Sequence, residues 1–105
     1  MERFDKVSVV KKANVYFDGK VTSRTVLWED GTRRTLGIIL PGRYEFGTAE
    51  RERMEILAGT LRALLPGTSL WAVFEAGQSF DVPARSRFTV ESDGVVDYCC
   101  SYFAE

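Results

Sequence analysis

The sequence predicts an all-β protein, either a sandwich or a barrel, and three observations support this class. Short segments rich in Val, Ile, Thr and aromatic residues recur along the whole chain. Turn signals such as Asp18-Gly19, Pro41-Gly42 and Asp93-Gly94 separate these segments at close intervals. No segment has the apolar period of a long helix, and the length of 105 residues fits one domain.

The expected strands lie between these turns, at residues 20–28, 32–40, 43–48, 54–58, 60–65, 71–75, 80–82, 87–90 and 95–103. Residues 49–57 contain good helix formers, but Gly47 and Gly59 enclose them closely. We therefore expect a turn there that leads into the strand at 54–58. Residues 1–13 form an N-terminal arm, with an apolar, strand-like stretch at 7–10 that has little of its own chain to pack on.

Two of the strands alternate in a way that bears on function, because successive side chains of a strand point to opposite faces. If the strand that begins at residue 43 continues to residue 50, four side chains share one face: Tyr44, Phe46, Thr48 and Glu50. A second set shares a face near the C-terminus: Tyr98, Cys100 and Tyr102. The first face suits a core that becomes polar at the mouth of a barrel. The alternative is a strand end that turns polar as it reaches solvent.

The charge balance argues against two classes of partner. The net charge is -1, so nothing favours an electrostatic grip on nucleic acid or on an anionic membrane. No apolar run approaches the roughly 20 residues that a membrane span needs. The two cysteines, Cys99 and Cys100, are neighbours without a distant partner for a disulfide. We expect a cytoplasmic protein without a signal peptide and without nucleic-acid or membrane partners.

The stretch GRYEFGTAERERMEILAG has the spacing of a known β-barrel motif. Gly42 is followed after five residues by Thr48, and then come Glu50, Met54 and Gly59. This spacing resembles the first motif of the cupin family, in which two histidines and a glutamate stand at the three middle positions. The resemblance implies a single cupin domain, a small jelly-roll β-barrel, over residues 1–105.

A second cupin motif also has a counterpart. Gly77 precedes Pro83 by the spacing of that motif, and Phe88 stands where the family has a histidine. Arg85 replaces a glycine that is usual in the motif.

The side chains at these motif positions do not suit a metal. The chain has no histidine, which is the commonest metal ligand and the usual general base. Transition metals need three or four converging N, O or S ligands. Glu50 is a competent anionic ligand, whereas Thr48 is a poor one, Met54 is soft and neutral, and Phe88 has no donor atom. We expect no metal at these positions.

Longer segments resemble a narrower group, the pyrimidine/purine nucleoside phosphorylases of cupin fold. They are NVYFDGKV from Asn14, LGIILPGRYEFGTAERERMEILAGTLRALLPG from Leu36, and WAVFEAGQSFDVPARSRF from Trp71. Residues 98–102 also fit, so the resemblance covers residues 14–102. It implies that inorganic phosphate displaces the base from purine and pyrimidine nucleosides, giving free base and ribose 1-phosphate. It implies neither a metal nor an organic cofactor.

Such phosphorolysis is possible without histidine. The transition state resembles an oxocarbenium ion, and the phosphate nucleophile is already an anion that needs no base. We expect Glu50 to be catalytic, because a carboxylate can accept hydrogen bonds from the vicinal ribose hydroxyls and stabilise positive charge on the sugar. The alternative is an exposed glutamate in the charged run 50–55. Thr48 is the second expected catalytic residue, with a hydroxyl that can donate to phosphate or sugar. The alternative for Thr48 is a residue that only ends a strand.

The expected substrate-binding residues are Tyr44, Phe46, Met54, Ser86, Phe88, Tyr98, Tyr102, Arg85 and Arg87. Aromatic rings can stack on any base, although core packing is the alternative for each ring. Phosphate needs a cation or N–H donors. Five arginines were candidates for that cation: Arg33, Arg34, Arg43, Arg85 and Arg87. We rank Arg85 and Arg87 first because they flank Ser86 beside the second motif.

Three other functions stay open. A cupin without metal can bind a sugar or nucleotide and leave it intact, an enzyme can use metal ligands outside the motif, or the role can be purely structural. Small cupins commonly pair, so the resemblance also implies a homodimer. The N-terminal arm is then expected to lie against the partner subunit.

Overall fold

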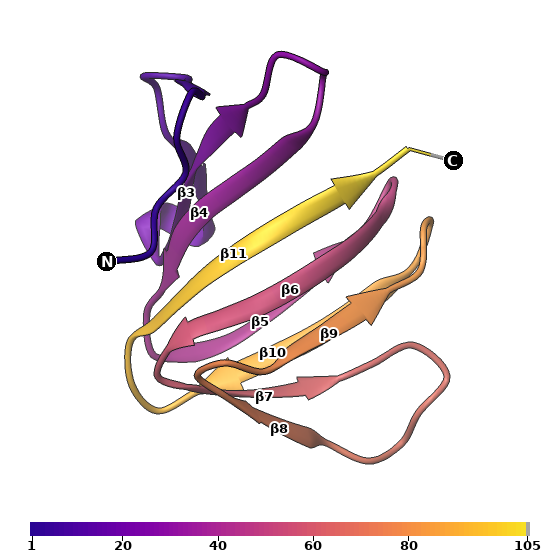
Figure 1. Ribbon diagram of the computed structural model, residues 1–105. Coiled ribbons are helices and arrows are strands. Elements are labelled where there is room, and N and C mark those ends of the chain that lie inside the picture. The colour runs from indigo at the N-terminus through magenta and orange to yellow at the C-terminus, as the bar shows by residue number, and fades with distance from the viewer. Residues whose placement is uncertain (105) are drawn as a thin grey trace.

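Two antiparallel sheets face each other and enclose the core (Figure 1). This computed structural model describes residues 1–104. The larger sheet contains β1 (Ser8–Val9), β2 (Asn14–Tyr16), β3 (Val21–Leu27), β4 (Arg33–Ile39), β6 (Arg51–Ala58), β9 (Ser79–Val82) and β11 (Val96–Phe103). The smaller sheet contains β5 (Gly42–Gly47), β7 (Thr60–Leu64), β8 (Ala72–Glu75) and β10 (Arg87–Ser92). The predicted all-β class is confirmed.

The strand order brings distant parts of the chain together. The larger sheet runs β1-β3-β4-β11-β6-β9, with β2 also paired to β3, and the smaller runs β5-β10-β7-β8. The C-terminal strand β11, yellow in Figure 1, therefore lies between β4 and β6 in the middle of the larger sheet. The short turn η1 (Phe17–Gly19) joins β2 to β3. No helix within residues 1–104 has the length and apolar character needed to cross a membrane.

The core fills the space between the two sheets. Its members come from strands of both sheets, and the largest fully buried side chains are Val21, Ile39, Ile56, Leu61, Val82, Val90, Val96 and Cys99. All but Cys99 belong to one cluster with the aromatic residues that line the site described below. Burial of this apolar surface is the main term that holds the sheets together.

Strand β6 is formed by the residues with the best helix propensity in the chain. It begins at Arg51, earlier than expected, and runs to Ala58. Met54 and Ile56 are buried, whereas Arg53 is exposed and donates from Nε to Asp81 Oδ1 of β9 at 2.8 Å. Alternation of burial and cross-strand pairing therefore outweigh helix propensity in this segment.

Strand β5 ends at Gly47, close to the expected end at residue 48, so the condition under which Glu50 would share its face is not met. The backbone N–H of Thr48 donates to the carbonyl of Ser86 at 2.9 Å, and the chain bends at Ala49 and Glu50 before β6 begins. The bend breaks the alternation of side chains, and Glu50 does not share a strand face with Tyr44.

The N-terminal arm packs on its own chain, contrary to the expectation that it has little to pack on. Ser8 and Val9 pair with the edge of β3, and the N–H of Val10 donates to the carbonyl of Thr25 at 2.9 Å. Phe4 lies edge-on against Trp28, with ring centroids 4.8 Å apart. Contact between the arm and a partner subunit stays a prediction.

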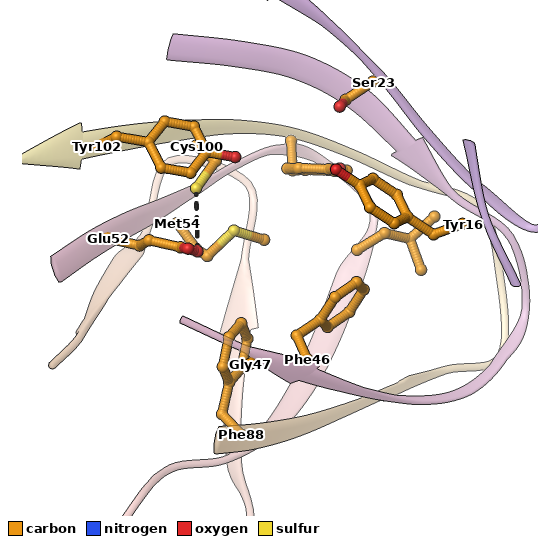
Figure 2. A pocket seen from close by; sticks show the side chains of 11 residues that line it. Tyr16, Ser23, Phe46, Gly47, Glu52, Met54, Phe88, Cys100 and Tyr102 are labelled. Atoms are coloured by element: carbon orange, nitrogen blue, oxygen red, sulfur yellow. Dashed lines mark hydrogen bonds between the residues drawn. The ribbon is translucent and has the colours of Figure 1, made fainter. Parts of the chain in front are cut away.

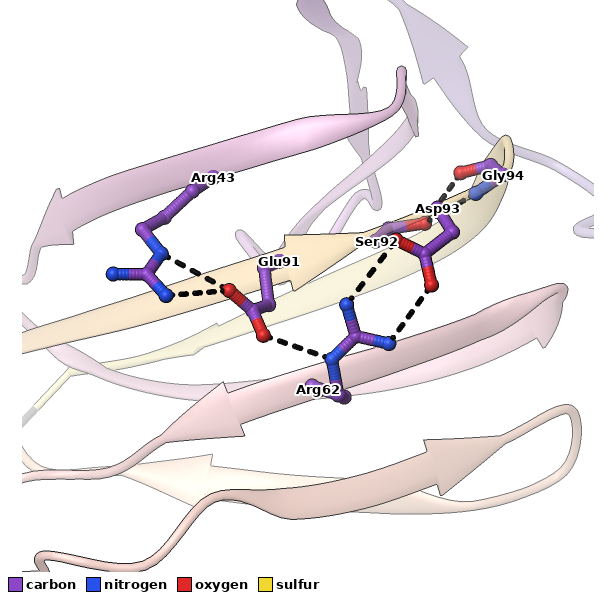
Figure 3. Close-up of polar contacts among 6 residues, drawn as sticks. All are labelled: Arg43, Arg62, Glu91, Ser92, Asp93 and Gly94. Atoms are coloured by element: carbon purple, nitrogen blue, oxygen red, sulfur yellow. Dashed lines mark hydrogen bonds and ion pairs between the residues drawn. The ribbon is translucent and has the colours of Figure 1, made fainter.

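A ladder of charges covers the outer face of the smaller sheet (Figure 3). Glu91 of β10 accepts from Arg43 Nε of β5 at 3.0 Å and from Arg62 Nε of β7 at 2.9 Å. Arg62 also pairs with Asp93, between Nη1 and Oδ2 at 3.3 Å. The hydrogen bond from Arg62, and then that from Arg43, holds the pKa of Glu91 below its usual range. These pairs join three neighbouring strands and mark this face as the solvent side.

Candidate functional site

A cavity of about 110 Å³ opens between the two sheets (Figure 2). The larger sheet and the smaller sheet each supply part of its wall, and β2 forms part of its rim. The lining consists of Tyr16, Ser23, Ile39, Phe46, Gly47, Glu52, Met54, Phe88, Tyr98, Cys100 and Tyr102.

Strand β11 supplies three of these side chains. Tyr98, Cys100 and Tyr102 all line the cavity, which confirms that they share one face of the strand. The intervening Cys99 points to the opposite face and is buried against the outer side of the sheet. Both thiols are free, as adjacent cysteines on opposite faces of a strand must be.

The ring of Tyr98 has room because its neighbour on β4 is Gly37. A Cβ on Gly37 would lie 2.8 Å from Cζ and Oη of Tyr98 and would collide with the carbonyl oxygen of Thr22. The glycine therefore lets the ring lie across β4. Burial raises the pKa of Tyr98 well above its ordinary value, so its hydroxyl stays protonated.

Aromatic rings from the smaller sheet form the opposite wall. Phe46 and Phe88 are stacked with centroids 5.6 Å apart and planes inclined by 29°. Phe17 packs edge-on against Phe46, with centroids 5.4 Å apart, and supports this wall from the turn η1. The wall offers apolar ring faces to whatever occupies the cavity.

Glu52 is the one charged side chain in the cavity lining that the structure describes. It is half-buried on β6, and its Oε1 accepts a hydrogen bond from the thiol of Cys100, with 3.4 Å between Sγ and Oε1 (Figure 2). Burial raises the pKa of Glu52, while the thiol and the nearby charge of Arg33 oppose the rise. The hydrogen bond from Cys100 uses Oε1 and not Oε2 of the carboxylate.

Cys100 acts as a donor to this carboxylate. Burial, and then the negative charge of Glu52, raises the pKa of the Cys100 thiol far above its ordinary value. A thiol in that state is a poor nucleophile, because the thiolate is the reactive form.

Tyr102 closes one side of the cavity. Its hydroxyl lies 3.3 Å from Thr35 Oγ1, and the guanidinium of Arg33 lies over its ring, 4.1 Å from the centroid. Tyr102 also lines a groove outside the cavity, so the ring is a wall shared by the two spaces.

Five of the predicted substrate-binding residues line the cavity: Phe46, Met54, Phe88, Tyr98 and Tyr102. Tyr44 does not line it. Its ring is buried in the core, and its hydroxyl lies 2.9 and 3.0 Å from the carbonyl oxygens of Leu40 and Pro41.

The two residues expected to be catalytic lie elsewhere. Thr48 is buried, and its hydroxyl donates to the carbonyl of Pro83 at 2.6 Å and accepts from the N–H of Ser86 at 3.0 Å. These bonds hold the turn between β9 and β10. Glu50 lies in the bend before β6, outside the cavity lining, and forms an ion pair with Arg33.

Of the residues predicted at the second motif, Phe88 lines the cavity, whereas Arg85, Ser86 and Arg87 do not. Ser86 Oγ donates to the carbonyl of Ala84 at 3.1 Å within the turn. Arg87 is exposed and pairs with Glu45, with 2.8 Å between Nη1 and Oε1. Arg85 is exposed with a backbone φ of 52°.

Sequence reasoning missed the polar residues of the cavity. Glu52 has the same strand parity as Met54 and Ile56, and this signal was available once β6 was taken as a strand from its first residue. Ser23 and Tyr16 could not be found in this way. Tyr16 lies on β2, which was not predicted from the sequence. Ser23 lies on β3, for which the sequence did not indicate which side chains face the core. Among residues 1–104, no three His, Cys, Asp or Glu side chains form a group that could hold a metal ion.

Comparisons with known proteins agree with one family. The family model described as pyrimidine/purine nucleoside phosphorylase matches residues 11–102. A protein of Wolinella succinogenes named pyrimidine/purine nucleoside phosphorylase is 60% identical over 102 residues, covering 97% of this chain and 97% of that protein.

Two solved structures place the fold. A protein of unknown function from Acinetobacter sp. ADP1 has a TM-score of 0.93 and 48% identity, over 96% of this chain and 98% of that one. A cupin superfamily protein from Desulfitobacterium hafniense has a TM-score of 0.68 at 14% identity, over 90% of this chain and 84% of that one. The second likeness concerns the fold alone, and it confirms the predicted cupin architecture.

Proposed function

The chain belongs to the pyrimidine/purine nucleoside phosphorylase family, and from that premise we propose that it cleaves purine and pyrimidine nucleosides with inorganic phosphate. The products are the free base and ribose 1-phosphate. We propose that no metal takes part, since the cavity offers one carboxylate and one protonated thiol as donors.

The observation that carries the proposal is the single half-buried carboxylate, Glu52, in a cavity with aromatic walls. Stacking on rings tolerates purines and pyrimidines alike, because every base has a π-face. The cavity of about 110 Å³ is smaller than the roughly 300–1,000 Å³ of pockets that bury a small molecule. It therefore suits part of a nucleoside, and the rest extends through the mouth.

We assign to Glu52 the role that the sequence suggested for Glu50. Its Oε1 is held by the Cys100 thiol, which leaves Oε2 to accept hydrogen bonds from the ribose hydroxyls. An oxygen of hydrogen phosphate forms a bond to C1′ as the glycosidic C–N bond breaks, the electron pair leaves with the base, and the proton given up by hydrogen phosphate ends on the base. The carboxylate stabilises the positive charge that develops on the sugar.

The test is to incubate the purified protein with uridine, guanosine or adenosine, with and without phosphate. Chromatography follows the free base and ³¹P NMR follows ribose 1-phosphate. We expect both products only when phosphate is present. Glu52→Gln should lose the activity, while Glu55→Gln, an exposed glutamate of the same strand on the opposite face, should keep it.

Two outcomes would contradict this proposal. Nucleoside that binds and stays intact would identify a binding module. Full occupancy of a transition metal in the active protein, measured by elemental analysis, would identify a metal-dependent enzyme.

We further propose that the protein is a cytoplasmic homodimer. Leu36 and Leu57 are exposed on the outer face of the larger sheet, where apolar side chains favour contact with another subunit. The free thiols of Cys99 and Cys100 suit a reducing compartment. Light scattering at micromolar concentration should give the mass of a dimer, and a monomer would contradict the proposal.

A further inference from the structure

We propose that phosphate binds in the groove beside Tyr102, outside the aromatic cavity, and that Arg33 is the residue that holds it. This inference rests on the proposed phosphorolysis for its role in the reaction, although the phosphate site can be measured without it. It replaces the assignment of Arg85 and Arg87 as the first-ranked phosphate ligands.

The cavity itself is unsuited to phosphate. Its lining contains no Lys or Arg among the described residues, and its one charged group is the carboxylate of Glu52. An anion in that space would meet a like charge and apolar rings, without a cation to offset either. Phosphate must therefore approach the sugar from a neighbouring space.

The groove is the neighbouring space with positive charge. It has a volume of about 490 Å³ and shares Tyr102 with the cavity. Its charged lining consists of three arginines and two carboxylates: Arg33, Arg34, Arg51, Asp30 and Glu50. Unlike the cavity, the groove has cationic side chains in its lining, so it suits an anion better than the cavity does.

Arg33 is the arginine of the groove that lies over Tyr102, the residue shared with the cavity. Its guanidinium carbon lies over the Tyr102 ring, 4.1 Å from the centroid, and its charge is near enough to Glu52 to influence the pKa of that carboxyl. The Arg33 side chain is 41% exposed, and its recorded hydrogen bond within residues 1–104 is the one from Nη2 to Glu50. The other N–H groups of the planar fork can therefore donate to two phosphate oxygens at once.

The other two arginines of the groove are directed elsewhere. Arg34 lies over the rings of Trp28 and Phe4, with 5.2 and 5.5 Å between its Cζ and their centroids. Arg51 lies over Phe103 and pairs with Asp81, with 3.3 Å between Nη1 and Oδ2. They add to the positive potential of the groove, whereas Arg33 is the residue that contacts phosphate.

This arrangement gives Glu50 a role as a positioning residue. Its ion pair with Arg33 orients the guanidinium over Tyr102. Phosphate held by Arg33 in the groove and ribose held by Glu52 in the cavity would then lie on either side of the Tyr102 ring. The phosphate would be directed at the sugar past the edge of that ring.

The test measures how the reaction rate depends on phosphate and on nucleoside separately, in wild type, Arg33→Gln and Arg33→Lys. Arg33→Gln should raise the KM for phosphate by roughly tenfold or more, as expected when a hydrogen bond to a charged group is lost. The KM for uridine should stay within about twofold, since a surface substitution away from the nucleoside changes little. Arg24→Gln, an exposed arginine of β3, is the matched control and should leave both constants unchanged.

Phosphate binding is measured in parallel by calorimetry, without nucleoside. Wild type should bind phosphate, and Arg33→Gln should bind it at least roughly tenfold more weakly. If phosphorolysis is absent but this difference is found, the proposed function fails and the phosphate site stands. An unchanged phosphate affinity in folded Arg33→Gln, or a loss caused by Arg87→Gln instead, would overturn the inference.

Discussion

Arg85 holds a backbone conformation that favours glycine. It has a φ of 52° in the turn between β9 and β10, at the position where the cupin motif usually has a glycine. The Cβ of an L-residue in this left-handed region costs about 1–2 kcal/mol. The side chain itself is exposed. Arg85 therefore strains the turn locally, and its side chain is not part of the cavity lining.

A pair of substitutions tests this strain. We expect Arg85→Gly to be more stable than Arg85→Ala by about 1 kcal/mol, because alanine keeps the unfavourable Cβ and glycine removes it. Urea unfolding of the two variants gives the difference. Equal stabilities, or a more stable alanine variant, would show that the turn is relaxed.

Glu52 is expected to make stability depend on pH. Its pKa is raised in the folded chain above the ordinary glutamate value of 4.5, mainly by burial. In the interval between 4.5 and the raised pKa the folded state holds more protons than the unfolded chain, so the free energy of unfolding falls as pH rises through that interval. The destabilisation caused by burying the ionised carboxylate is complete at pH values above this interval and absent at pH values below it.

Glu52→Gln removes this titration. The stability of the variant relative to wild type should therefore be greater at about pH 7 than at about pH 4. Urea unfolding at both pH values measures it, with Glu55→Gln as the exposed control. A difference between variant and wild type that is the same at both pH values would mean that Glu52 is solvated like an ordinary surface glutamate.

At the scale of elements, the sequence predicted most strands and missed where two of them begin and end. Alternation of β-favouring segments with turns was enough for β3, β4, β10 and β11. The hydrogen bonds from Thr48 to the turn at Pro83 and Ser86 end β5, and no local pattern reports such a distant contact. Because of that bend, the carboxylate that lines the cavity belongs to Glu52 and not to Glu50.

The same limit applies to the site. Strand parity placed Phe46, Tyr98 and Tyr102 in the cavity lining. Tyr44, which shares the parity of Phe46, is buried in the core and does not line the cavity. Which of the arginines is placed to bind phosphate depends on which strand ends lie beside the cavity. Arg33 lies beside Tyr102 since β4 pairs with β11, and this pairing joins segments far apart in the chain.

Gly37 offers a test of how β4 shapes the cavity. Alanine at this position would place a Cβ against the backbone of β3 and the ring of Tyr98. We expect Gly37→Ala to lower the free energy of unfolding by roughly 1–3 kcal/mol, the usual cost of overpacking.

The control is Gly94→Ala, since a Cβ there meets nothing within 4 Å. Near-UV circular dichroism should also change for Gly37→Ala if the Tyr98 ring is displaced. A Gly37→Ala protein as stable as the Gly94→Ala protein would show that the two strands separate easily and that the glycine is not required.

At the scale of the whole molecule, the surface ion pairs and the candidate site lie in separate places. The outer face of the smaller sheet carries the ladder around Glu91, while the space between the sheets holds apolar and aromatic side chains and the single carboxylate of Glu52. Phosphate and nucleoside would meet where the groove and the cavity adjoin, at Tyr102. Under the proposed function, the cupin frame would hold a reaction site where the family motif places metal ligands.

The most direct measurement compares kcat/KM for phosphorolysis of uridine in Glu52→Gln and Glu50→Gln, both folded as wild type. We expect Glu52→Gln to lose roughly 100-fold or more, as when a group that stabilises transition-state charge is removed. Glu50→Gln should lose less than roughly tenfold, because a half-exposed ion pair contributes little. Full activity in Glu52→Gln together with an inactive Glu50→Gln would contradict the account.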